Sequence, residues 1–127
     1  MGFMYDGEEC NDEFVEAFLA CGLWTHNELD GFKIHDIHEG DIDWILNECN
    51  DFQFKAEQII RQYAPSLVVD ETQLGHDFLL TRNGHGAGFW DGDWPDPLGN
   101  HLTTLSKRFC EIYFYKGDDG KIYIDKC

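Results

Sequence analysis

Apolar side chains recur every three or four residues between Asp41 and Tyr63, and Pro65 follows this pattern directly. Such spacing places the apolar side chains on one face of an α-helix, and proline cannot continue a helix. We therefore expect a long amphipathic helix over residues 41–63, with its N-terminal cap at Gly40 or Asp41. Because one face of this helix must be buried, the chain must form a packed core. The stripe consists of Ile42, Ile45, Leu46, Cys49, Phe52, Ala56, Ile59, Ile60 and Tyr63.

Two shorter helices are predicted in other parts of the chain. The first follows Asn11 or Asp12, either of which can cap a helix, and it ends near Gly22. Its apolar stripe consists of Phe14, Val15, Phe18 and Leu19. The other helix begins after Pro97, where the segment 94–97 interrupts the chain. Its stripe consists of Leu98, Leu102, Leu105 and Phe109.

The remaining C-terminal sequence is typical of two β-hairpins. The first hairpin pairs residues 76–81 with residues 88–91 around a glycine-rich bend. The second pairs residues 112–115 with residues 122–124, and its turn has the sequence Gly-Asp-Asp-Gly at 117–120. The turn signal is strong because Asp-Gly supplies the backbone conformation that tight turns need.

These elements predict an α+β fold in the order ααββαββ. We expect two N-terminal helices, one intervening helix, and one four-stranded antiparallel sheet that is built from both hairpins. A chain of 127 residues fits a single domain over residues 1–127. Residues 1–10 are expected to be flexible.

Acidic residues are concentrated in the first two fifths of the chain. The 25 Asp and Glu residues outnumber the 9 Lys and Arg residues, and the formal net charge is −16. Residues 1–51 carry −13 of this charge, whereas residues 52–127 carry −3. This excludes a conventional nucleic-acid-binding domain, which needs a basic surface, and argues against docking on an anionic membrane. The acidity either serves solubility or forms an electronegative face for a basic partner.

The five cysteines favour an intracellular protein. They are odd in number, and no two form a C-x-x-C pair or a zinc-finger spacing. We therefore expect reduced thiols and a cytoplasmic location. An acidic N-terminus without a basic signal segment and the lack of a long apolar run agree with this expectation. The cysteines are Cys10, Cys21, Cys49, Cys110 and Cys127.

Neither a metal nor a cofactor is expected. His35 and His38 lie three residues apart, but the segment has neither zinc-ligand spacing nor the pattern of a calcium-binding loop. The aromatic rings could stack on bases only beside a cationic groove, which this composition does not favour. Most of these rings are expected in the core or on strand faces. The rings considered are those of Trp24, Trp44, Trp90, Trp94, Tyr113, Tyr115 and Tyr123.

Two strings in the C-terminal half are distinctive. Residues 80–91 read LTRNGHGAGFWD, and residues 115–123 read YKGDDGKIY. Together with the segment CGLW at 21–24, they resemble a family of small acidic proteins encoded by bacteriophages. The resemblance implies a phage origin and action in the cytoplasm of the host cell, but it implies no activity and no catalytic residue. The loop at 94–97 departs from the family, whose members tend to have a shorter glycine-rich turn there.

The glycine-rich bend is a possible contact site. Its exposed backbone amides could bind an anion, and histidine beside a carboxylate can act as an acid or a base. The bend lacks the ending of a Walker loop, and no catalytic triad can be assembled, so we predict no catalytic residue. The alternative is structural, with Arg82 paired to Asp77 or Asp91. The candidate contact residues are Asp77, Arg82, His85, Trp90 and Asp91.

The charge asymmetry favours a non-enzymatic inhibitor that imitates nucleic acid and binds a basic, nucleic-acid-binding protein of the host. Duplex DNA carries about one negative charge per 1.7 Å, and a face of carboxylates can offer a similar density. We expect no direct contact with nucleic acid or membrane. A small enzyme or ligand-binding protein with its site at the bend, and a self-assembling phage component, are the alternatives. The carboxylates expected on one continuous partner-facing surface are Asp12, Glu13, Glu16, Asp36, Glu39, Asp41 and Asp43.

Overall fold

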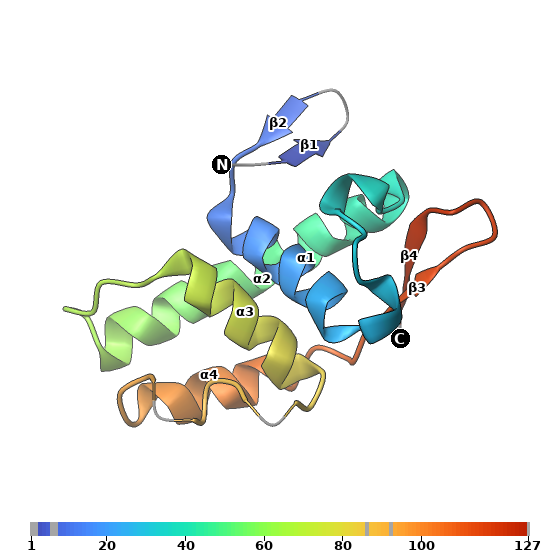
Figure 1. Cartoon of the computed structure of the whole chain (residues 1–127). Coiled ribbons are helices and arrows are strands. Elements are labelled where there is room, and N and C mark those ends of the chain that lie inside the picture. The colour runs from blue at the N-terminus through green and yellow to red at the C-terminus, as the bar shows by residue number, and fades with distance from the viewer. Residues whose placement is uncertain (1–2, 6–7, 86, 92, 127) are drawn as a thin grey trace.

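The computed structural model of the chain describes residues 3–5, 8–85, 87–91 and 93–126. Helices form the body of this part of the chain, and two small antiparallel hairpins are attached to it (Figure 1). The helices are α1 (Glu13–Thr25), α2 (Glu39–Tyr63), α3 (Glu71–Arg82) and α4 (Leu98–Ser106). The hairpins are β1 (Phe3–Tyr5) with β2 (Glu8–Cys10), and β3 (Tyr113–Lys116) with β4 (Ile122–Asp125). The 3-10 turns η1 (Asn27–Leu29) and η2 (Ile34–Asp36) connect α1 to α2.

The long helix α2 confirms the amphipathic pattern between Asp41 and Tyr63. The predicted cap at Gly40 or Asp41 is wrong by two or three residues, because the helix begins at Glu39 and is capped by His38, whose Nδ1 accepts a hydrogen bond from the backbone N–H of Gly40 at 3.0 Å. The helix ends at Tyr63, two residues before Pro65, as expected. The buried members of its stripe face the core and include Ile42, Ile45, Cys49, Phe52, Ala56 and Ile60.

Helices α1 and α3 pack closely along each other (Figure 1). A Cβ atom on Gly75 of α3 would lie only 2.4 Å from the carbonyl oxygen of Phe14 in α1, so the contact requires glycine. Aromatic rings fill the space between these helices and α2. The rings of Phe52 and Phe78 stack with their centres 3.9 Å apart, and Phe18 packs on Phe78 at 5.3 Å. This aromatic cluster forms the centre of the core.

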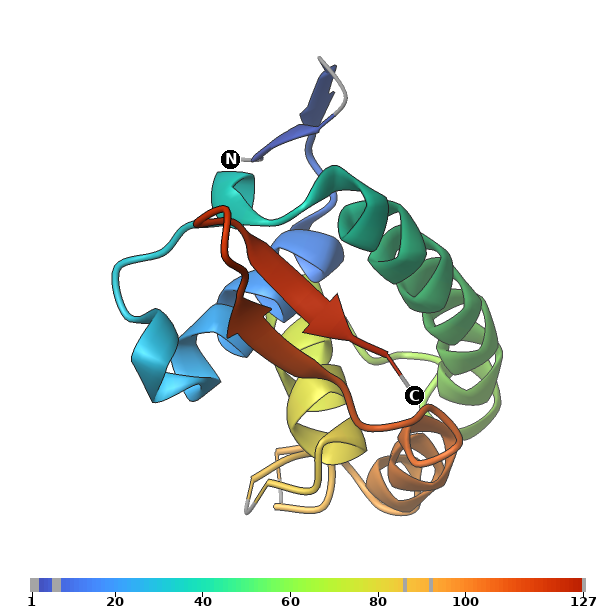
Figure 2. The same cartoon turned by 90° about the vertical axis from the view of Figure 1, so that its right-hand side faces the viewer.

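The C-terminal hairpin lies in front of α1 and α3 in Figure 2. Phe114, Ile122 and Ile124 point inward and are buried. The backbone N–H of His38 donates to the carbonyl of Ile122 at 2.8 Å, which fastens β4 to the start of α2. Phe114 also occupies the space beside Gly22, where a Cβ atom would lie 2.3 Å from its ring. The hairpin is therefore part of the core packing.

The predicted four-stranded sheet is wrong. Residues 76–81 form part of helix α3, and residues 88–91 form turns. After the N-terminal strands, the described chain follows the order ααααββ, with one C-terminal hairpin in place of two. The error has a physical cause, because α3 buries Asp77, Thr81 and Arg82 beside its apolar residues. These buried polar side chains hide the helical period, and the short apolar run that remains looks like a strand.

Three smaller expectations concern the N-terminus, the cysteines and membrane-spanning helices. Within residues 1–10, expected to be flexible, β1 and β2 pair with each other, while residues 1–2 and 6–7 lie outside the described residues. Cys10, Cys21 and Cys49 have free thiols, but Cys110 is disulfide-bonded, so the prediction of reduced cysteines is wrong for Cys110. Cys127 is not among the described residues. Within the described chain, no helix is both long enough and apolar enough to cross a membrane.

Candidate functional site

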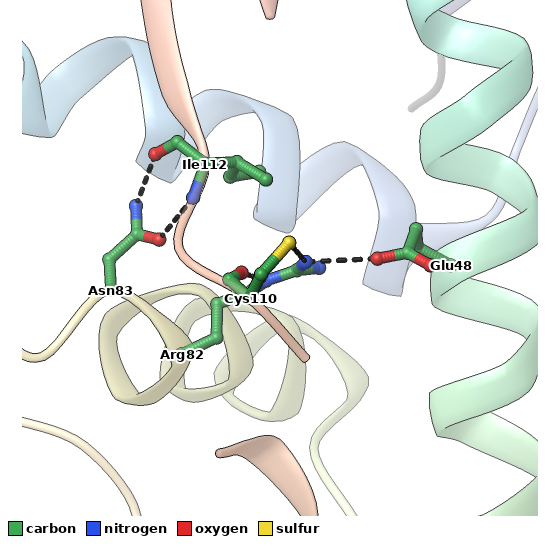
Figure 3. A network of polar contacts seen from close by, with 5 residues as sticks. All are labelled: Glu48, Arg82, Asn83, Cys110 and Ile112. Carbon is green, nitrogen blue, oxygen red and sulfur yellow. Dashed lines mark hydrogen bonds and ion pairs between the residues drawn. The ribbon is translucent and has the colours of Figure 1, made fainter. Parts of the chain in front are cut away.

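Arg82, the first candidate of the glycine-rich bend, lies inside the protein. Its side chain is 0% exposed and extends from the last turn of α3 (Figure 3). Nε donates to the carbonyl oxygen of Cys110 at 2.8 Å, and Nη2 donates to the carboxylate of Glu48 at 2.9 Å. The guanidinium carbon is 5.2–5.9 Å from the centres of four surrounding rings. These rings belong to Phe18, Trp44, Phe78 and Phe109.

The electrostatics of Arg82 indicate a structural role. Burial lowers the pKa of its guanidinium, and Glu48 opposes this shift by hydrogen bonding and by charge. Nη1 is buried and has no hydrogen-bond partner among the described residues. The expected pairing of Arg82 with Asp77 or Asp91 is therefore wrong, because its anion is Glu48 of α2. The side chain joins α3, α2 and the segment before β3, and no ligand can reach it without opening the core.

Asn83 continues this internal network. Its Nδ2 donates to the carbonyl of Ile112 at 3.0 Å, and its Oδ1 accepts from the backbone N–H of Ile112 at 3.0 Å (Figure 3). The side-chain amide thus satisfies both backbone groups of one residue, in the way that a neighbouring strand would. The end of α3 is thereby fixed to the segment that enters β3.

Asp77 is also buried. Its Oδ2 accepts a hydrogen bond of 2.6 Å from Nε1 of Trp94. Burial raises the pKa of this carboxyl group, the Trp94 hydrogen bond opposes the rise, and the negative charges of Asp91 and Asp93 add to it. The hydrogen bond between the Asp77 carboxylate and the Trp94 indole therefore connects α3 to the loop before α4.

The other bend residues lie closer to the surface. His85 is half-buried, and Trp90 is exposed. The carboxylate of Asp91 accepts from the backbone N–H of Gly88 at 3.3 Å, which stabilises the turn. No hydrogen bond or ion pair joins His85 to Asp77, Arg82 or Asp91 in the described part of the chain. Gly86, at the centre of the bend, is outside the described residues.

The predicted partner-facing carboxylates lie in two groups, one at the start of α1 and one around the start of α2. Asp12, Glu13 and Glu16 lie at the start of α1, next to the start of α3 (Figure 1). The other four surround the start of α2, beside the hairpin β3–β4. They are Asp36, Glu39, Asp41 and Asp43.

Within the second group, the carboxylates differ in what they contact. Asp41 is buried, and it accepts from the backbone N–H of Ile124 at 2.9 Å and pairs with Lys126. It therefore holds the C-terminal strand and does not face solvent. Asp36 accepts from the backbone N–H of Lys33 at 2.8 Å. The exposed members, Glu39 and Asp43, stay available to a partner.

A larger acidic cluster gathers around the starts of α1 and α3. We call it the acidic end, and it comprises Asp12, Glu13, Glu57, Asp70 and Glu71. Asp12 and Asp70 cap the two helices by accepting backbone N–H bonds. Desolvation raises the pKa of Glu71, and repulsion from the other four carboxylates raises it further. Of the five, only Glu57 forms an ion pair within the described chain, with Arg61.

The solvent-facing row of α1 leads from the acidic end to an exposed apolar surface. The row has helical spacing of three, four and four residues and consists of Glu13, Glu16, Ala20 and Trp24. Trp24 is 78% exposed. It and Ala20 separate two hollows, one of about 690 Å³ toward residues 29–35 and one of about 380 Å³ toward His76 and Leu80 of α3. The row therefore combines carboxylates with an apolar ridge.

Sequence reasoning missed two parts of this site. Trp24 was expected in the core or on a strand face, although it falls four residues after Ala20 and off the apolar stripe of α1. Asp70 and Glu71 were missed because no helix was predicted between Pro65 and Pro97. The signal was present, since Asp70 followed three residues later by Gln73 is a typical start of a helix.

The described residues include no group of three His, Cys, Asp or Glu side chains that could hold a metal ion. Comparisons with protein-family models, with curated proteins and with solved structures found no match for this chain. The candidate site therefore rests on its own geometry and charge.

Proposed function

We propose that this protein is a non-enzymatic inhibitor that binds a basic, nucleic-acid-binding host protein through the acidic end. The observation that carries the proposal is the gathering of five carboxylates around three helices, and four of these carboxylates form no ion pair within the described residues. Like charges that are held together in this way repel one another, and a cationic partner relieves the repulsion. Burial raises the pKa of Glu71, and the charges of its acidic neighbours raise it further.

The local fold explains how the cluster is tolerated without a partner. Asp12 and Asp70 accept hydrogen bonds from the first backbone N–H groups of α1 and α3. The positive ends of two helix dipoles also favour the acidic residues in these first turns. The cluster is thus fixed in position, and its exposed carboxylates can accept the charge-assisted hydrogen bonds that Lys and Arg otherwise make to phosphates.

The resemblance to phage-encoded proteins supports a target in the host cytoplasm. A restriction enzyme, a CRISPR effector, a repair enzyme or a nucleoid protein would present a basic surface of the required kind. A small enzyme at the glycine-rich bend is less favoured, because Arg82 and Asp77 are engaged inside the core.

The test is a capture experiment from bacterial lysate at low and high salt, with identification of the bound protein. The variant Asp12→Asn, Glu13→Gln, Asp70→Asn and Glu71→Gln removes four charges but keeps residues that can cap both helices. The matched control removes four exposed charges elsewhere, with Glu39→Gln, Asp43→Asn, Asp118→Asn and Asp125→Asn.

We expect the wild type and the control to capture one nucleic-acid-binding protein, to release it in high salt, and to compete with DNA or RNA for it in a gel-shift assay. The acidic-end variant should neither capture this protein nor compete with DNA or RNA for it. Equal capture by both variants would exclude the acidic end as the binding surface. A captured protein that still binds its nucleic acid normally would refute the inhibitor proposal.

A further inference from the structure

We infer that the partner segment is a lysine- or arginine-rich amphipathic helix whose apolar face covers Trp24 and Ala20. This inference rests on the proposed function and names the element of the partner that the site would bind. The acidic end alone selects for positive charge, whereas the row on α1 adds a requirement for apolar side chains at a fixed distance from that charge.

The apolar half of the site has the form of a ridge between two hollows. Trp24 projects from the last turn of α1 and is 78% exposed, which is a large apolar surface to leave in water. The larger hollow is lined on its far side by Leu29 and Phe32. The smaller one is lined by Cys21 and Leu80. Tryptophan is a frequent centre of protein–protein contacts because its ring offers a large, rigid contact area.

Charge complementarity defines the chemistry of the occupant. From Trp24, the exposed row of α1 continues through Ala20 to Glu16 and Glu13, and then reaches the acidic end. Asp30 adds a carboxylate to the rim of the larger hollow, and Lys33 lies on the same rim. Positive charge on the partner must therefore lie toward Glu13, and apolar side chains must lie over Trp24.

The dimensions fit a helix. Eleven residues separate Glu13 from Trp24, which corresponds to about 16 Å along α1, or three helical turns. A helix lying along this row would place side chains from neighbouring turns in the hollows on both sides of the ridge. Basic nucleic-acid-binding segments often become helical on binding, so an acidic surface with an apolar ridge can compete for them.

The test uses defined peptides and the full chain. The probe is a dye-labelled 14-residue peptide of leucine and lysine with helical apolar spacing. One control peptide has the same composition in scrambled order, and another replaces every lysine with glutamate. Binding is measured by fluorescence anisotropy for wild type, Trp24→Ala, Ala20→Lys and Phe54→Ala. Phe54 is a matched control, because it is an exposed aromatic residue (65%) on α2.

We expect the amphipathic basic peptide to bind wild type at least tenfold more tightly than either control peptide. Trp24→Ala and Ala20→Lys should each weaken binding by tenfold or more, and Phe54→Ala should change it less than twofold. Because Trp24 and Ala20 are exposed, both variants should keep the melting temperature of the wild type. Equal affinity for the scrambled peptide, or unchanged binding by both row variants, would overturn the inference.

The two proposals fail in different ways. If the acidic-end variant loses the host protein while Trp24→Ala keeps it, the inference about the helix is wrong and the proposed function stands. If Trp24→Ala loses the host protein while the acidic-end variant keeps it, binding depends on the apolar ridge and the electrostatic proposal is wrong.

Discussion

The pair of Glu48 and Arg82 allows a quantitative test of the internal network. The Arg82 side chain is fully buried, whereas that of Glu48 is 24% exposed. Glu48→Gln removes the only anion that contacts the guanidinium in the described chain but keeps a hydrogen-bond acceptor. Breaking a buried ion pair from one side typically costs 3–5 kcal/mol, because an uncompensated charge stays buried. We expect about 3 kcal/mol, at the lower end, because Glu48 is partly hydrated and four rings surround the cation.

The second variant, Arg82→Met, separates the charge from the packing. Methionine fills a similar space among the rings and leaves Glu48 near solvent, but the carbonyl of Cys110 loses its donor. That loss should cost about 1–2 kcal/mol. The double variant Glu48→Gln with Arg82→Met then contains no buried charge, and we expect it to cost only about 1–2 kcal/mol as well. The double variant should therefore be more stable than Glu48→Gln alone.

Urea unfolding of the four proteins measures this cycle. With a slope of about 2 kcal/mol per molar urea, the midpoint of Glu48→Gln should fall by about 1.5 M, and that of the double variant by about half as much. The slope itself should stay constant across the four proteins. A double variant at or below the midpoint of Glu48→Gln would refute the reasoning, since it would show that the buried charge is not what destabilises the single variant.

Three other substitutions test separate contacts. Gly22→Ala places a Cβ atom 2.3 Å from the Phe114 ring and should cost about 1–3 kcal/mol in thermal unfolding, with amide shifts of β3 and β4 in NMR spectra. Asn83→Ala removes two hydrogen bonds to one backbone residue and should cost about 2 kcal/mol in urea unfolding. Asp77→Asn keeps an acceptor for Trp94 and removes a carboxyl group whose pKa is raised by burial. Wild type should lose stability relative to this variant as the pH rises from below about 3.9 to neutral, because the unfolded state then releases its proton first. Melting curves of both proteins at several pH values measure this difference, and the opposite trend would contradict the prediction.

The fold could be predicted from the sequence where the apolar spacing agrees with residues that end a helix or form a turn. Residues 41–63 met both conditions, and so did the C-terminal hairpin with its Gly-Asp-Asp-Gly turn. Helix α3 could not be recognised from its period, because Asp77 and Arg82 occupy inward positions that a pattern assigns to apolar residues. Their partners, Trp94 and Glu48, are distant in the sequence and become neighbours only in the fold.

The candidate site was predictable in composition but not in arrangement. Glu13 and Glu16 were proposed from the sequence because charge counting does not depend on the fold. Asp41 was placed on the surface by the same reasoning, although the N–H of Ile124 and the amine of Lys126 hold it inside. Counting cannot distinguish a carboxylate that faces solvent from one that is hydrogen-bonded in the core, because both are acidic residues near a helix start.

Several residues of the string at 80–91 form hydrogen bonds that hold the fold together. Thr81 accepts the backbone N–H of Phe89 at 3.2 Å, Arg82 joins three segments, and Asn83 binds both backbone groups of Ile112. A chain that shares this string can therefore share the fold without sharing a partner. Within the described part of the chain, the side chains of the exposed row of α1 form no hydrogen bond or ion pair, so they are free to match a target. If this row binds the partner that we propose, replacing Ala20 and Trp24 by other residues should change which protein is captured from lysate, whereas the melting temperature should stay unchanged.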